Sequence, residues 1–421
     1  MSKTMQEDKK RLVPRLRFPE FRDVEVWVSE SAGTVFAQVT NKSHNADLPV
    51  LAITQEQGAI PRELIDYHVS VSEKSLKGYK IVEVGDFVIS LRSFQGGIEY
   101  SNYHGICSPA YVILRLKGGY SSSYFQYYLK THQFIKALTK NLEGLRDGKM
   151  ISYKQFSEVF LVIPKTEEQQ KIADCLSSLD ALIAAQAEKI ETLKTHKVGL
   201  MQQLFPREGE TVPRLRFPEF RGAGKWNVTT LGEVAEVSSG GTPARSKAEY
   251  WNGDIPWVST SLIDFSEIDK AQEYITSDGL NNSSARVVKK GTILMAMYGQ
   301  GKTRGKVGVL SIDAAINQAC AAISVSGKVK SDFLFQNLAG RYDEIRKISN
   351  SGGQENLSAA LIKGINLIYP DSKSGEQQKI ADCLSSIDAL ITAQADKLDA
   401  LKAHKKGLMQ QLFPSPEQLD I

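Results

Sequence analysis

The stretch EQQKIADCLSSLDALIAAQAEKIETLKTHKVGLMQQLFP at residues 168–206 returns at residues 376–414 as EQQKIADCLSSIDALITAQADKLDALKAHKKGLMQQLFP. Roughly four in five positions are identical, so the stretch is a repeated structural unit. Its apolar positions recur at alternating steps of four and three, which predicts a long helix with a heptad seam. The seam of the first copy is Ile172, Leu176, Leu179, Ile183, Gln186, Ile190, Leu193, Lys197, Leu200 and Leu204, and that of the second is Ile380, Leu384, Ile387, Ile391, Gln394, Leu398, Leu401, Lys405, Leu408 and Leu412.

The two seams are expected to pair with each other as antiparallel helices. Each helix would run about 50 Å before a proline stops it, and the second must bring the chain back. Pairing of this kind places Gln186 near Gln394 at the midpoint, where a buried polar residue fixes register. We expect Lys197 to reach Asp388, and Lys405 to reach Asp180.

A second repeat divides the chain. VPRLRFPEFR occurs at residues 13–22 and again, letter for letter, at residues 212–221. The expected order of parts is an N-terminal domain at residues 13–165, a helix at 166–206, a linker at 207–221, a second domain at 222–373, a second helix at 374–414 and a tail at 415–421. Two variable domains therefore sit in a duplicated frame.

Both variable domains are expected to be α+β with a largely antiparallel sheet. In the first domain, residues 79–91, 110–116 and 159–164 are expected to be strands, and residues 122–142 a helix that ends near Gly144. In the second, the strands are residues 291–299, 306–311, 320–325 and 364–370, and the helix is residues 331–349.

Composition sets looser limits on function. A net charge of +4 and a pI near 8.6 allow an anionic partner without requiring one. Four cysteines without CxxC spacing favour a reduced, cytoplasmic protein without structural zinc. No apolar stretch has the length of a membrane span, so no membrane partner is expected.

Three segments resemble catalytic or metal-binding motifs, but the residues around them do not meet the requirements of those motifs. The segment GQGKTRGK at residues 299–306 ends like a phosphate loop, but Ala296 stands where a glycine is needed and a strand pattern follows. In PDSKSGEQQK, Glu376 suits the positive end of a helix better than a nuclease site. His196 and His404 fit a helix surface better than a metal site. We therefore assign no catalytic residue, no metal and no cofactor to the chain.

Loops of the second domain carry residue types that suit DNA. Arginine and lysine match phosphate and guanine, whereas glutamine and asparagine match adenine. The nominated residues are Arg245, Lys247, Tyr250, Tyr298, Gln300, Lys302, Thr303, Arg304, Gln354 and Asn356. The competing interpretation is that Trp251 and Trp257 are core aromatics and that the glycines only make turns, and for the tryptophans it is favoured.

The chain resembles the specificity subunits of type I restriction-modification systems along nearly its full length. The resemblance rests on the two helix repeats, on PRLRFPEF before each domain, and on GGTPARSKAEYWNGDIPWVS with MAMYGQGKTRGKVG in the second domain. It implies two target recognition domains that each read half of a bipartite site in double-stranded DNA, with the helices as spacer. It also implies two methyltransferase subunits, a motor-nuclease subunit, and S-adenosylmethionine, ATP and Mg²⁺ used by those partners.

The first domain departs from this pattern because it lacks the GGTP, YW and IPW signature. By local analogy we nominate Arg92, Gln95, Tyr100 and Asn102 for DNA, and Arg146, Lys149 and Lys154 for phosphate. The repeated phenylalanines Phe18, Phe21, Phe217 and Phe220 are expected to bind the two methyltransferase copies.

Half-sites one helical turn apart, about 34 Å, would suit two readers on such a frame. Two alternatives remain: a coiled-coil scaffold without sequence-specific DNA binding, and an enzyme that modifies or cuts DNA without partners.

Overall fold

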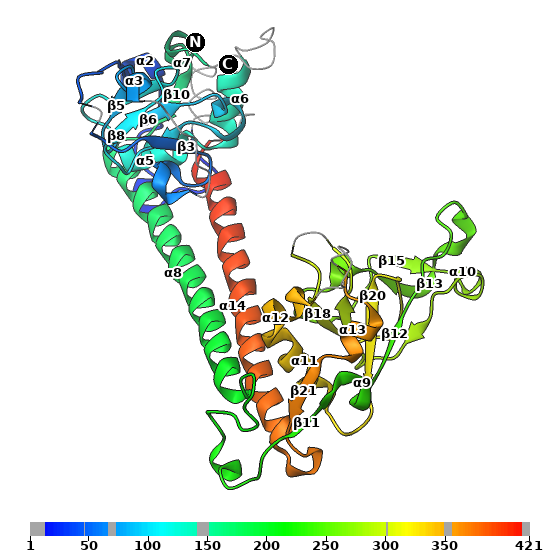
Figure 1. Cartoon of the computed structure of the whole chain (residues 1–421). Helices are drawn as coiled ribbons and strands as arrows, with labels where there is room; N and C mark the ends of the chain where they lie inside the picture. Colours follow the sequence, from blue (N-terminus) through cyan, green and yellow to red (C-terminus); the bar gives the residue numbers. More distant parts are fainter. Residues whose placement is uncertain are drawn as a thin grey trace. The chain divides into compact units, whose positions relative to one another are not determined.

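The computed structural model describes residues 13–45, 47–65, 73–140, 151–299, 302–348 and 356–414. They form two compact units: unit 1 comprises Met1–Ala187 and Asp396–Ile421, and unit 2 comprises Glu188–Ala395. The two long helices labelled in Figure 1, α8 (Thr166–Leu204) and α14 (Glu376–Leu412), each pass from one unit into the other. Every unit therefore contains one variable domain, half of α8 and half of α14.

The helix halves run antiparallel within each unit. In unit 1 the first turns of α8 share a core with Leu408 and Leu412, at the end of α14, and Lys405 donates to Asp180 at 2.5 Å. In unit 2 the order is reversed, and Lys197 donates to both carboxylate oxygens of Asp388 at 2.7 Å. The antiparallel direction and both lysine–aspartate pairs are confirmed. The nearness of Gln186 to Gln394 stays a prediction, because these residues belong to different units.

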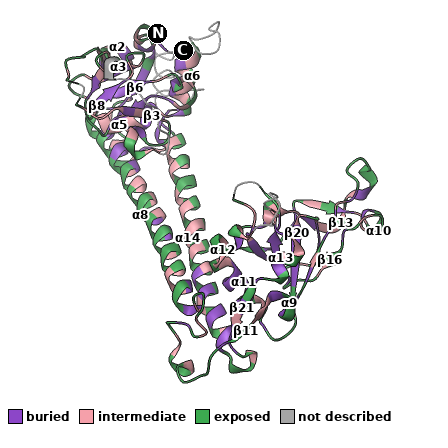
Figure 2. Cartoon of the chain, in the orientation of Figure 1, coloured by how far each residue is buried: buried purple, intermediate pink, exposed green. Residues whose placement is uncertain are grey.

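The heptad seam also agrees with burial. Every predicted seam residue is buried or half-buried, whereas neighbouring positions such as Leu182 and Leu390 are exposed. Figure 2 shows this alternation of exposed and covered positions along α8 and α14.

Unit 1 places a mixed layer of strands and short helices on its helix halves. The elements are η1 (Pro19–Phe21), β1 (Val28–Ser31), α2 (Ala32–Val35), β2 (Phe36–Val39), β3 (Leu51–Thr54), β4 (Gly58–Pro61), η2 (Arg62–Leu64), α3 (Glu73–Leu76), β5 (Lys80–Val82), β6 (Phe87–Ile89), α4 (Ser93–Gly96), β7 (Glu99–Tyr100), β8 (Gly105–Cys107), β9 (Val112–Leu116), α5 (Ser122–Tyr128), α6 (His132–Lys140), α7 (Tyr153–Ser157) and β10 (Phe160–Ile163). The main sheet has the order β2-β9-β6-β7, and β1 pairs with β10, β3 with β4 and β5 with β8. The ladders between these strands are antiparallel.

Unit 2 follows the same plan with more strands. Its elements are η3 (Pro218–Phe220), β11 (Asn227–Thr230), α9 (Leu231–Val234), β12 (Ala235–Ser239), η4 (Ala248–Tyr250), β13 (Trp251–Val258), η5 (Thr260–Leu262), β14 (Glu267–Ile268), β15 (Glu273–Ile275), α10 (Ser277–Asn281), β16 (Val287–Val288), β17 (Ile293–Ala296), β18 (Val307–Leu310), β19 (Ala314–Ile316), β20 (Cys320–Val325), α11 (Ser331–Gly340), α12 (Tyr342–Lys347), α13 (Ala359–Lys363) and β21 (Asn366–Tyr369). One sheet has the order β12-β20-β17-β18-β14, a second has β15-β13-β19-β16, and β11 pairs with β21. Only β13 with β19 and β14 with β18 run parallel among the described strands. The predicted α+β class with a largely antiparallel sheet is confirmed.

Three predicted elements are wrong in their continuity. The helix expected at residues 122–142 is interrupted between α5 and α6, where the Thr131 hydroxyl donates to the Tyr128 carbonyl. The helix expected at residues 331–349 is interrupted at Arg341, between α11 and α12. The strand expected at residues 79–91 is two strands, because Gly85 turns the chain with φ of 96°. The predicted end of the first helix near Gly144 lies outside the described residues.

The repeated VPRLRFPEFR segment is a joint between the two long helices. In unit 1 the Leu16 amide donates to the Gln411 carbonyl near the end of α14, and Arg17 binds Glu168 in the first turn of α8. In unit 2 the Leu215 amide donates to the Gln203 carbonyl, and Arg216 binds Glu376. Each copy thus ties the start of one helix to the end of the other.

The helix-entry glutamines repeat the same design. The side chain of Gln169 accepts from the Ser121 amide and donates to the Pro164 carbonyl. Gln377 makes the matching bonds with the Lys330 amide and the Pro370 carbonyl. Both units therefore hold their variable domain on the helix by the same contacts.

Candidate nucleic-acid interface

The glycine-rich turn of unit 2 packs against protein backbone. A Cβ atom on Gly240 would lie 1.8 Å from the Ile316 carbonyl oxygen, which no side chain allows. The Gly241 carbonyl accepts a hydrogen bond from the Trp257 indole at 3.0 Å, and Trp257 is buried. The core interpretation of Trp257 is therefore confirmed, and these glycines serve close packing within the unit.

Arg245 is held by both an aromatic ring and a carboxylate. Its guanidinium lies 3.7 Å from the centroid of the Trp251 ring, and its two terminal nitrogens donate to the two carboxylate oxygens of Glu273. This hydrogen-bonded pair raises the pKa of Arg245 and lowers that of Glu273. Trp251 is half-buried and packs edge-on against Trp257 at 5.3 Å.

Lys247 and Tyr250 form a neighbouring pair. The Lys247 ammonium donates to the Tyr250 hydroxyl at 2.9 Å and lies 4.8 Å from the ring centroid. Tyr250 is buried, whereas Lys247 is exposed. The ring therefore supports the lysine, and only the lysine presents a charge to solvent.

The loop that follows β17 contains one exposed ring and one internally bonded arginine. Tyr298 is 41% exposed, so its ring is available to stack on a base. Arg304 is half-buried and donates to the Arg346 carbonyl at 2.8 Å. The carbonyl of Lys302 accepts from the Tyr342 hydroxyl, while its side chain points to solvent and Thr303 is half-buried. Gln300 lies outside the described residues.

The third nominated segment reaches the same loop. The Leu357 amide donates to the Met297 carbonyl at 2.9 Å, which joins the segment of half-buried Asn356 to the loop that contains Tyr298. Gln354 lies outside the described residues. The structure therefore brings two of the three predicted segments together, while the pair formed by Arg245 and Trp251 belongs to the other sheet of the unit.

Unit 1 has a groove of about 700 Å³, and of the residues nominated in this unit only Arg92 lines it among those that the structure describes. Arg92 is exposed and lines it together with Gln55 and Arg62. Gln95 is exposed on α4, and Asn102 is exposed after β7. The ring of Tyr100 packs edge-on against buried Phe87 at 5.2 Å, so Tyr100 is partly a core residue. Lys154 lies apart on α7, which packs on α2, and Arg146 and Lys149 lie outside the described residues.

Sequence reasoning missed Glu99, which lines the same groove. Only 1% of this residue is exposed, and the Lys130 ammonium lies 2.6 Å from its carboxylate. Burial raises the pKa of Glu99, against the opposing effect of Lys130. At this burial the carboxylate does not reach a base, so its role is to hold the Lys130 ammonium beside the groove. The sequence gives no signal for Glu99, which begins the short strand β7. Its partner Lys130 comes from the break between α5 and α6.

The four predicted partner-binding phenylalanines are all half-buried, but only two of them pack on a core. Phe18 packs against the core of unit 1 and Phe217 against that of unit 2. Lys171 and Lys379 lie 5.7 and 5.8 Å above these two rings. Phe21 and Phe220 are half-buried in η1 and η3 and belong to no buried cluster of the described residues. The two outer rings are therefore the better candidates for a partner contact.

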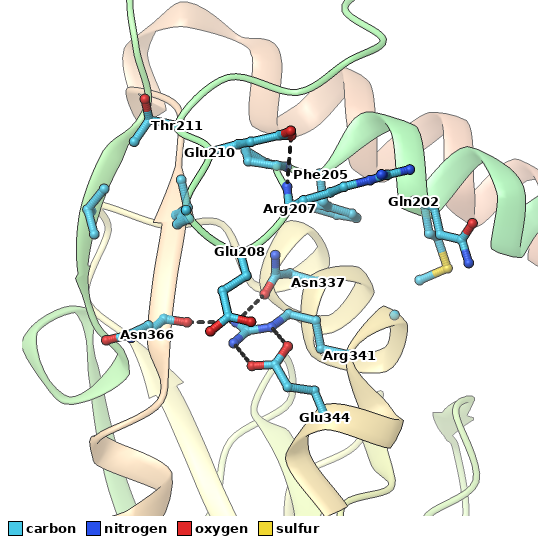
Figure 3. Close-up of a pocket in the computed structure, with 16 residues that line it drawn as sticks. Gln202, Phe205, Arg207, Glu208, Glu210, Thr211, Asn337, Arg341, Glu344 and Asn366 are labelled. Atoms are coloured by element: carbon cyan, nitrogen blue, oxygen red, sulfur yellow. Dashed lines mark hydrogen bonds and ion pairs between the residues drawn. The ribbon is translucent and has the colours of Figure 1, made fainter. Parts of the chain in front are cut away.

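A pocket of about 740 Å³ in unit 2 lies between the linker after α8 and α11 (Figure 3). Arg341 crosses it and donates to both oxygens of Glu344, at 2.9 and 2.6 Å, and to the Asn366 carbonyl at 2.6 Å. Glu208 approaches from the linker. The arginine is thus committed to protein acceptors, which makes this pocket a joint of the unit rather than a nucleic-acid site.

The rejected catalytic motifs have structural roles. A turn and then β18 follow Lys302, so the phosphate-loop context is absent in the described part of this segment. Glu376 binds Arg216, and Asp371 accepts from the Lys373 amide. Within the described ranges, no three His, Cys, Asp or Glu side chains gather as a metal site requires. His196 and His404 are exposed on their helices, and all four cysteines are free thiols. No membrane-spanning helix is found among the described residues.

The chain belongs to the family of the type I restriction modification DNA specificity domain, whose model matches residues 25–195 and 223–403. It is 27% identical over 348 residues to the specificity subunit of the MjaVIII type I restriction enzyme of Methanocaldococcus jannaschii, covering 79% of each chain. It is 25% identical over 173 residues to the EcoR124I/EcoR124II specificity subunit of Escherichia coli, covering 40% of this chain and 42% of that one.

Solved structures share the fold. The S subunit of the type I restriction-modification system of M. genitalium matches with a TM-score of 0.56 at 16% identity, covering 96% of this chain and 99% of that one. A chain from a study of complex assembly and conformational transition in a type I system matches with a TM-score of 0.58 at 15% identity, covering 93% and 98%. A role in DNA sequence specificity follows from the family.

Proposed function

We propose that the chain is the non-catalytic DNA-recognition subunit of a type I restriction-modification complex, and that each unit reads one half of an asymmetric, bipartite site in double-stranded DNA. The observation that carries the proposal is a contrast between the two units. They share their joints residue for residue, at Arg17 with Glu168 and at Arg216 with Glu376. Their loops differ in sequence and in the basic, amide and aromatic side chains they present, as two different half-sites require.

The long helices would serve as the spacer. Because α8 and α14 are each continuous from one unit into the other, their fixed lengths would set the number of unread base pairs between the half-sites. The repeated segment, with Phe21 and Phe220 half-buried, supports two equivalent docking surfaces for two copies of one methyltransferase subunit. A motor-nuclease subunit would complete the complex, and S-adenosylmethionine, ATP and Mg²⁺ would be bound by the partners.

The test is a map of modified adenines. DNA carrying random sequence is incubated with the chain, its methyltransferase partner and S-adenosylmethionine, and modified positions are read by sequencing. We expect methylation at one asymmetric motif interrupted by a fixed number of unspecified base pairs. The chain alone is expected to modify nothing, since activity without partners would favour an independent enzyme. Binding that shows no sequence dependence would favour the coiled-coil scaffold.

A matched exchange assigns the halves. Replacing residues 222–373 of unit 2 by the corresponding domain of another specificity subunit should change one half of the motif and leave the other half and the spacing unchanged. A change in both halves, or in the spacing, would contradict the assignment of one half-site to each unit.

A further inference from the structure

Glu273 uses one particular edge of the Arg245 guanidinium. The two terminal nitrogens of Arg245 donate to the two oxygens of Glu273, one at 3.0 Å and the other at closer range. This end-on arrangement leaves a second edge of the guanidinium unused by Glu273. That edge carries the Nε hydrogen and the neighbouring hydrogen of one terminal nitrogen. Within the described part of the chain, no protein acceptor is bound by Nε. Two parallel donors therefore stay available on that edge.

The plane of this edge is fixed by an aromatic ring. The guanidinium lies 3.7 Å from the centroid of Trp251, and Trp251 is held by its indole donating to the Ala244 carbonyl at 3.3 Å. Arginine stacked on an aromatic face and bound to a carboxylate loses little freedom when it makes two further hydrogen bonds. Two parallel N–H donors in a fixed plane match the O6 and N7 acceptors of guanine in the major groove.

The charge of the pair argues against a phosphate contact. Glu273 carries the opposite charge to Arg245 and is hydrogen-bonded to it, so the pair is neutral as a unit. A neutral pair gains little from phosphate, whose attraction depends on net positive charge and on released counterions. Lys247 of the same unit is better placed for phosphate, since it is exposed and hydrogen-bonded to a tyrosine hydroxyl rather than to an acid.

Open space adjoins the pair. A shallow cavity of about 440 Å³ is lined by Arg245 and Glu273 together with Asn252, Gln272 and Tyr274. Asn252 adopts φ of 63°, a left-handed conformation that is unusual for a residue with a side chain. The polar rim lies where the edge of a base would approach the arginine.

From this geometry we infer that Glu273 is a positioning residue that makes Arg245 a reader of guanine rather than a general phosphate contact. This inference rests on the proposed function and names one base class in the half-site read by unit 2. It gives the acidic residue Glu273 a role in sequence specificity, although DNA itself is an anion.

The test compares Glu273→Gln with Asp313→Asn in the complete methyltransferase complex. Asp313 forms an exposed ion pair with Lys289 in the same unit, at 2.7 Å, so its substitution changes the charge equally without touching Arg245. Binding to a library of half-site variants is measured at several salt concentrations. In Glu273→Gln the preference for guanine at one position should fall about 5- to 100-fold. The slope of log affinity against log salt should steepen by about 0.9 as the freed arginine contacts phosphate.

Two further variants keep the outcome decisive. Arg245→Lys should lose the same guanine preference, and Glu273→Asp should keep the wild-type salt slope while the preference falls. If Glu273→Gln behaves like Asp313→Asn while the wild-type complex discriminates sequences, the inference is wrong and the proposed function stands. If the wild-type complex shows no sequence preference, both are wrong.

Discussion

Arg17 and Glu168, which are 151 residues apart, form a two-point ion pair at 2.8 and 2.7 Å while only 6% and 2% of their side chains are exposed. The same arginine donates to the Val24 and Glu25 carbonyls, so one guanidinium joins the repeated segment to the first turn of α8. The negative carboxylate also lies at the positive end of the helix dipole. The VPRLRFPEFR repeat therefore has a structural role in addition to any role with a partner.

Substitution Glu168→Gln should lower the free energy of unfolding of unit 1 by about 3–5 kcal/mol, because it leaves Arg17 buried without its counter-charge. Denaturant unfolding monitored by hydrogen exchange in residues 13–22 measures the change. Lys165→Ala removes the exposed pair with Glu25, where 60% and 80% of the side chains are accessible, and should cost less than about 1 kcal/mol. Equal losses in the two variants would contradict the buried clamp.

The tie between helices should give a small but measurable coupling. Lys405 and the Tyr127 hydroxyl both donate to Asp180, at 2.5 and 2.8 Å. A double-mutant cycle of Lys405→Met and Asp180→Asn should give a coupling of about 0.5–1 kcal/mol, since the side chains are partly solvated. A coupling indistinguishable from zero would mean that the pair does not stabilise the antiparallel arrangement.

The phenylalanines should separate folding from assembly. Because Phe18 and Phe217 pack on the cores, replacing both by alanine should lower the melting temperature of the chain. Replacing Phe21 and Phe220 instead should leave the melting temperature nearly unchanged and abolish formation of the complex with two methyltransferase subunits. Sedimentation of mixtures measures assembly, and full assembly of the second variant would exclude these rings from the docking surface.

Arg304 and Lys302 should affect DNA binding differently. Arg304 donates to the Arg346 carbonyl, so Arg304→Ala should loosen the loop and relax preference only in the half-site read by unit 2. Lys302 presents an exposed side chain, and Lys302→Ala should weaken binding to all sequences alike and reduce the salt slope by about 1. Altered preference in the other half-site would refute the assignment of this loop.

Glu99 should make unit 1 less stable as the pH rises. Burial raises its pKa in the folded chain, so the folded unit holds the proton more tightly than the unfolded chain. Stability is then highest below the ordinary glutamate pKa and falls as the pH passes through the raised value. Glu99→Gln should flatten this dependence, measured as melting temperature between about pH 4 and 8, whereas Glu56→Gln, at an exposed position of the same groove, should not.

The parts of the fold that depend on regular spacing could be predicted from the sequence. The helices α8 and α14 follow from their seam, and the pairs of Lys197 with Asp388 and Lys405 with Asp180 follow from antiparallel geometry alone. The candidate DNA-binding site could be predicted less well, because its geometry depends on partners that are far apart in the sequence. Arg245, in a turn, was identifiable by type, but its partner Glu273 lies 28 residues away on β15 and carries no local signal.

Breaks within helices were missed for a related reason. Apolar periodicity continues across residues 129–131, and the interruption comes from the Thr131 side chain, which bonds to the backbone on both sides. Such competition between side chain and backbone is not visible in the spacing of apolar residues. The clamp of Arg17 was also hidden, because an arginine in a charged stretch resembles any solvated residue.

The division of unit 1 into two chain segments has a consequence for synthesis on the ribosome. The ring centroid of Phe413 lies 5.6 Å from that of Tyr124 and 5.8 Å from that of Tyr128, in a core that also contains Trp27. Unit 2, by contrast, is one uninterrupted stretch. During translation the first-made segment of unit 1 must therefore wait, with its aromatic surface uncovered, until Phe413 has been synthesised, whereas unit 2 can fold before that point. The N-terminal domain, although it is made first, would therefore be the last to complete its core.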